Sequence, residues 1–139
     1  MADQRDVELL EDLLAREHRL LSAYEAALRR DAIDASLGET FRGHEHEHVR
    51  ALEQTLADAG RRNPRASVPS PELTAALRDR NAFAEFAKEL EDETIRMYVD
   101  AAASVRDPEL RRALGSVMAC GAAHVVALKD ALGSRFLVN

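Results

Sequence analysis

Several features are scarce in this chain, and the scarcity of cysteine and of long apolar runs excludes particular classes of protein. Cys120 is the only cysteine in 139 residues, which excludes an internal disulfide framework and a fused electron donor that needs CxxC pairs. Tryptophan is absent and aromatic residues make up 4%, while six glycines and four prolines leave few breaks in regular structure. No apolar run approaches the roughly 18 residues that a membrane-spanning helix needs.

The charge balance is acidic, with 25 Asp and Glu against 19 Lys and Arg and a net charge of −6. Nucleic acid and anionic membranes both require a basic surface, so neither is expected as a partner. The first residues, MADQRDVELLEDLL, are charged and lack the apolar core of a signal peptide. Together with the single cysteine, they lead us to expect a soluble, cytoplasmic protein.

Leu, Ala, Arg and Glu are abundant, and apolar residues recur at helical spacing in four segments. A Pro- and Ser-rich stretch, 61–72, is the only obvious long loop, and a short helix is expected just after it. Asp34 and Asp107 are expected N-caps, and Gly133 a stop signal. The predicted helices cover residues 6–30, 34–60, 71–77, 81–105 and 108–131.

The links within each pair of long helices are short, so each pair forms an antiparallel hairpin. The long segment after the second helix can carry the chain across the bundle. No alternation typical of strands is present. We therefore predict an all-α fold: one domain, 1–139, in which two antiparallel hairpins form a four-helix bundle joined by a long crossover with a short extra helix.

Five ionisable residues lie on the apolar stripes that these helices should bury. They are Glu17, Glu45, His48, Glu91 and His124. At about 1.5 Å per residue their heights along the bundle agree within a turn. Buried charges are rare unless they are paired, and no Lys or Arg lies at the centre of any stripe. A metal ion is the natural counter-charge for such a layer.

The stretch GHEHEHVRAL, residues 43–52, contains two overlapping metal motifs. His44, Glu45 and His48 spell HExxH, the motif of zinc proteases, whereas Glu45 and His48 alone spell ExxH, the unit of di-iron bundles. His44 lies about 60–70° from the centre of the stripe, and neither a third zinc ligand nor a peptide cleft is evident. We favour ExxH. Alternatively, the stretch is only a solvated helical face.

These residues make the chain resemble the ferritin-like superfamily, in particular small bacterial ferritin-like proteins of the di-iron carboxylate type. The resemblance rests on EHRLLSAY, GHEHEHVRAL, LEDETIRMY and CGAAH, and it spans the chain from Glu17 to His124. It implies the five residues above as ligands of iron, alternatively manganese, with ferroxidase or oxygen- or peroxide-reducing chemistry. Metal ions and dioxygen or peroxide would be the partners, and a homo-oligomer is compatible with the family.

The chain departs from the family pattern at Gly121, where a fourth glutamate is expected. Two divalent ions bring a charge of about +4, which three carboxylates do not cancel in a site of low dielectric constant. A water, a bound acid or the Cys120 thiolate could restore the balance. The alternative is a degenerate bundle without redox activity that acts as a structural, stress or ligand-binding module, with a pocket opened at Gly121.

Overall fold

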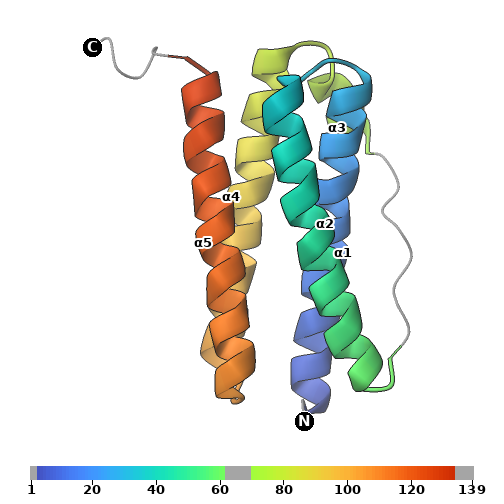
Figure 1. Ribbon diagram of the computed structural model, residues 1–139, viewed down its shortest axis with the longest axis vertical. Coiled ribbons are helices and arrows are strands. Elements are labelled where there is room, and N and C mark those ends of the chain that lie inside the picture. The colour runs from blue at the N-terminus through green and yellow to red at the C-terminus, as the bar shows by residue number, and fades with distance from the viewer. Residues whose placement is uncertain (1–2, 62–69, 134–139) are drawn as a thin grey trace.

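Five helices make up the part of the chain that the computed structural model describes, residues 3–61 and 70–133 (Figure 1). No strand occurs within these ranges. The helices are α1 (Gln4–Arg29), α2 (Ala35–Asp58), the short α3 (Pro71–Ala76), α4 (Arg80–Ser104) and α5 (Pro108–Ala131). The predicted bounds differ from these by no more than two residues, and the all-α prediction is confirmed.

The helix ends follow from local chemistry. The Asp34 carboxylate accepts a hydrogen bond from the backbone N–H of Leu37 at 3.1 Å and starts α2. Asp107 caps α5 in the same way, and Pro108 occupies the first turn of that helix, where its missing N–H costs nothing. Gly133 follows α5 with φ +90°, a backbone conformation that side chains disfavour. Both predicted N-caps and the predicted stop are confirmed.

The long helices form two antiparallel hairpins, α1 with α2 and α4 with α5, which pack together mainly through α1 and α4 (Figure 1). α2 ends at one end of the bundle and α3 begins at the other (Figure 1). The predicted crossover falls mainly on residues 62–69, which lie outside the described residues. Across the two hairpins, α1 lies beside α4 and α2 lies beside α5.

The apolar core is divided into two clusters along the bundle axis. One contains Tyr24, Phe41 and Phe83, and the other contains Leu10 and Leu56. Along their helices, the buried side chains of Glu17, Glu45, Glu91 and His124 fall between positions of one cluster and positions of the other. The fold thus surrounds a polar layer with hydrocarbon on both sides, which excludes water and strengthens electrostatic interactions within it.

Ala131, an apolar residue near the end of the last predicted helix, is exposed. It is the final residue of α5, where Leu132 instead turns inward. Among the described residues, no helix combines the length and apolar character needed to cross a membrane.

Candidate metal centre

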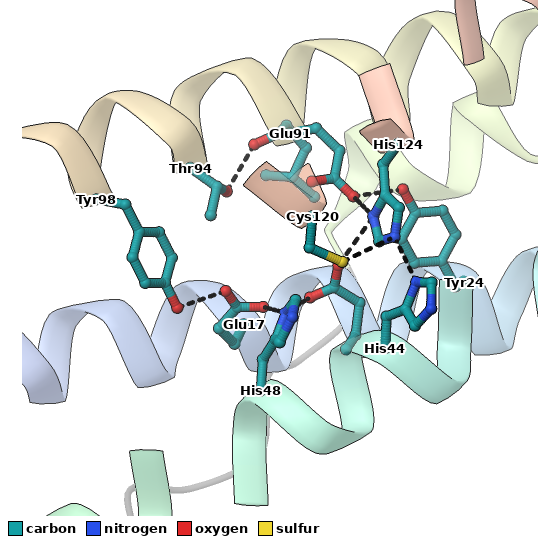
Figure 2. Close-up of polar contacts among 11 residues, drawn as sticks. Glu17, Tyr24, His44, His48, Glu91, Thr94, Tyr98, Cys120 and His124 are labelled. Carbon is teal, nitrogen blue, oxygen red and sulfur yellow. Dashed lines mark hydrogen bonds and ion pairs between the residues drawn. The ribbon is translucent and has the colours of Figure 1, made fainter. Parts of the chain in front are cut away.

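The four long helices bring the five predicted residues together in mid-bundle (Figure 2). Glu17 comes from α1, Glu45 and His48 from α2, Glu91 from α4 and His124 from α5. The three glutamates and His124 are each 1% exposed, whereas the His48 side chain is 13% exposed. Four of the five side chains are therefore sealed from solvent, and His48 lies at the edge of the layer.

Glu45 stands between two groups of possible ligands. On one side, His48 Nδ1 lies 3.4 Å from Glu45 Oε2 and 3.6 Å from Glu17 Oε2. On the other, His124 Nδ1 lies 3.2 Å from Glu45 Oε1 and 2.8 Å from Glu91 Oε1. Within each trio the potential ligand atoms lie within 4.8 Å of one another. One carboxylate can thus serve two adjacent ions.

Two buried tyrosines tie the layer together across the hairpins. The Tyr98 hydroxyl on α4 donates to Glu17 Oε1 on α1 at 2.6 Å. Reciprocally, the Tyr24 hydroxyl on α1 donates to Glu91 Oε1 on α4 at 2.7 Å (Figure 2). Both are short hydrogen bonds between a buried hydroxyl group and a buried carboxyl group. The carboxyl groups of Glu17 and Glu91 are therefore each oriented by a tyrosine from the opposite hairpin.

Burial and mutual proximity shift the pKa values in this layer strongly. Burial, with a contribution from Glu45, raises the pKa of Glu17 to about 8, and burial also raises the pKa of Glu91. Burial acts in the same direction on Glu45, but hydrogen bonds with Glu17 and both imidazoles hold its pKa below the usual value. Burial opposes charge on the imidazoles, yet hydrogen bonds with the carboxylates raise the pKa of His48 to about 11 and that of His124 to about 9.

Without a metal, protons therefore balance the charge of this layer. At neutral pH Glu17 retains its proton and both imidazoles are cationic. Within the described ranges, the only nitrogens in ion pairs with the three carboxylates are those of the imidazoles, and Glu17 Oε2 has His48 Nδ1 at 3.6 Å. This set of carboxylate oxygens and imidazole nitrogens is compatible with a bound metal cation.

Ile95 fills the space beside Gly121. A Cβ atom placed on Gly121 would lie 3.2 Å from Ile95 Cγ1 and 3.5 Å from Glu91 Oε2. The adjoining cavity measures about 10 Å³, which is room for about one water molecule. The expectation that Gly121 opens a pocket for a small molecule is therefore wrong, because a neighbouring apolar side chain has taken the place of the missing carboxylate.

Two further residues border the layer: Cys120, whose thiolate the sequence offered as one way to balance the charge, and His44, which the sequence placed away from the centre of its stripe. His44 Nδ1 lies 2.9 Å from His124 Nε2, and Cys120 Sγ lies 3.6 Å from the same nitrogen (Figure 2). His44 and Cys120 are both half-buried. The HEHEH pattern signalled three histidines, but only the packing of α2 beside α5 shows that His44 reaches His124 while His46 faces solvent.

Comparison with known protein families gives a single answer. The model of the ferritin-like domain matches residues 5–134. The chain belongs to the ferritin-like domain family. No curated protein and no solved structure gave a match. Membership confirms the resemblance drawn from the sequence, and the buried carboxylate and imidazole groups of this ferritin-like domain are compatible with metal binding.

Proposed function

We propose that this ferritin-like domain binds iron, alternatively manganese, in the mid-bundle layer and acts as a ferroxidase or as an oxygen- or peroxide-reducing oxidoreductase. One observation carries the proposal: three carboxylates and two imidazoles converge in a buried layer, and two overlapping ligand trios share Glu45. Carboxylate oxygens prefer hard cations and imidazole suits iron, so the donor set favours iron or manganese over ions that prefer thiolates.

Each residue has a distinct part in this proposal. Glu45 would bridge two ions, Glu17 and Glu91 would be terminal ligands, and His48 and His124 would each hold one ion. The tyrosine hydroxyls would orient the terminal carboxylates through the hydrogen bonds described above. Bound iron would supply the redox chemistry, in which Fe(II) is oxidised to Fe(III) while dioxygen or peroxide is reduced.

The second candidate is a ferritin-like bundle that has kept the fold without redox activity. Gly121 and Ile95 support it, since an apolar side chain occupies the space where a fourth carboxylate would complete the site. A structural or stress role fits this arrangement better than ligand binding does, because the cavity beside Gly121 holds about one water. The two candidates differ in whether the three remaining carboxylates still hold a metal tightly.

Metal analysis separates the candidates. Protein purified without metal resin is analysed for its metal-to-protein ratio, then titrated anaerobically with Fe(II) and exposed to air. We expect tight uptake and an absorbance change on oxidation, both lost in Glu45→Gln. Glu47→Gln is the matched control, because Glu47 lies on the exposed face of the same helix. A ratio near two supports both trios and a ratio near one supports a single trio, whereas no uptake and no absorbance change would overturn the proposal.

A further inference from the structure

A second cluster of metal-ligating atoms lies on the outer side of His124. His44 Nδ1, Cys120 Sγ and His124 Nε2 all lie within 4.8 Å of one another. None of the three atoms belongs to the carboxylate layer, because His124 faces that layer with its other nitrogen, Nδ1. We propose that His44, Cys120 and His124 form a separate site for a divalent ion that accepts a thiolate ligand, such as Zn²⁺.

The distances suit tetrahedral coordination. With Zn–N near 2.05 Å and Zn–S near 2.3 Å, a tetrahedral ion separates a nitrogen and a sulfur ligand by about 3.6 Å and two nitrogens by about 3.3 Å. Cys120 Sγ is 3.6 Å from His124 Nε2. His44 Nδ1 is 2.9 Å from His124 Nε2, so it must retreat by about 0.4 Å to make room for an ion. His44 is half-buried and can make that movement.

His124 is held in the orientation that a zinc ligand requires. A ligating histidine typically donates its other ring N–H to a carboxylate, which fixes the tautomer and makes the ligand more basic. His124 Nδ1 lies 2.8 Å from Glu91 Oε1, so with the proton on Nδ1 the Nε2 lone pair points toward His44 and Cys120. Phe41 stacks on the His124 ring, with centroids 3.9 Å apart and planes at 25°, and fixes its plane.

The electrostatics of this outer site differ from those of the inner layer. Cys120 would bind the ion as a thiolate, because coordination removes the proton from the sulfur. One thiolate leaves a divalent ion with a charge of +1, which the buried carboxylates behind His124 balance. Because His44 and Cys120 are partly exposed, an ion can enter from solvent and a water can take the fourth position.

The outer site and the proposed inner centre compete for one histidine. A neutral imidazole has a single nitrogen lone pair, so His124 binds either an outer ion through Nε2 or an inner ion through Nδ1. The trio of Glu17, Glu45 and His48 does not use His124 and stays available in both cases. The chain can therefore hold one oxygen-ligated ion and one sulfur-ligated ion at the same time.

Cobalt(II) titration of the reduced protein tests the outer site, because Co(II) replaces Zn(II) and reports a thiolate ligand by near-ultraviolet charge-transfer absorption. We expect one equivalent per chain with this band and with the intense visible bands of tetrahedral Co(II), all removed by Zn(II). Cys120 is the only cysteine, so the band reports this residue alone. His44→Gln should weaken binding at least tenfold, and His46→Gln, an exposed neighbour, should leave it unchanged.

The inner centre is tested separately, by anaerobic Fe(II) titration of the same variants. Glu17→Gln should keep the charge-transfer band, since Glu17 is not a ligand of the outer site, while Cys120→Ser should keep Fe(II) uptake by the inner trio. Absence of the band from the unchanged protein, or a band of equal affinity in His44→Gln, would overturn the outer site. Loss of Fe(II) uptake with the band intact would instead overturn only the proposed function.

Discussion

Glu17→Gln should stabilise the metal-free protein at neutral pH and destabilise the metal-loaded protein. The pKa of Glu17 rises from 4.5 to about 8 on folding because the side chain is buried. A carboxyl group with a raised folded-state pKa contributes stability below pH 4.5 that is lost as pH rises to 8. At pH 7 the loss amounts to about 3 kcal/mol at 1.36 kcal/mol per pH unit. Glutamine has nearly the same shape, does not titrate, and keeps an oxygen that can accept from Tyr98.

Urea denaturation of the chelator-treated proteins at pH 5, 7 and 8 measures this effect. The advantage of Glu17→Gln in the free energy of unfolding should be small at pH 5 and grow toward pH 8, reaching about 3 kcal/mol at pH 7. With Mn(II) present the order should reverse, because the variant loses one ligand of the Glu45 and His48 trio. Glu47→Gln on the exposed face of α2 should show neither effect. A metal-free variant less stable than the unchanged protein by the same margin at every pH would refute the reasoning.

Three further predictions concern the same layer. Tyr98→Phe removes the hydroxyl that orients one terminal carboxylate, and Tyr24→Phe removes its counterpart; each should weaken Mn(II) binding roughly 10–100-fold in equilibrium titrations. Gly121→Glu should lower the melting temperature because its Cβ meets Ile95 at 3.2 Å, whereas the same change combined with Ile95→Ala should recover stability and raise the metal-to-protein ratio. Because the metal-free layer holds protons on Glu17 and on both imidazoles at neutral pH, metal binding should release protons in a pH-stat and weaken as pH falls.

The sequence predicted the fold and the polar layer because both depend on helical periodicity. Glu17 and Glu91 interrupt apolar stripes at the three–four spacing of a buried helix face, and the Asp107–Pro108 pair gives a helix start that needs no tertiary information. The common depth of the layer followed from counting residues to the nearest helix end, since the rise per residue is constant. Each of these features belongs to a single helix, so the order of residues along the chain is enough to predict it.

Features that depend on how the hairpins pack could not be predicted in the same way. In the sequence Tyr24 follows Glu17 at the same spacing as Tyr98 follows Glu91. Nothing in that spacing indicates that each tyrosine donates to the glutamate of the other hairpin. His44 was placed at the edge of its stripe, and its contact with His124 depends on the rotation of α2 relative to α5. Such rotations are set by side-chain volumes at the interface, which a single sequence does not reveal.

The layer has two halves, one around His48 and one around His124. They are alike where the two hairpins exchange hydrogen bonds, and they differ where α2 meets α5. The tyrosine hydroxyls impose the same restraint on both terminal carboxylates, so the geometry of these two oxygens is nearly symmetric. The symmetry ends at α5, where Gly121 contributes no donor and Ile95 closes the space, while the preceding Cys120 directs its sulfur to the opposite nitrogen of His124. Gly121 thus leaves the inner side of His124 without an oxygen donor, while Cys120 places a sulfur donor on the outer side. An ion that prefers oxygen should therefore favour the half with His48, and an ion that prefers sulfur should favour the outer side of His124.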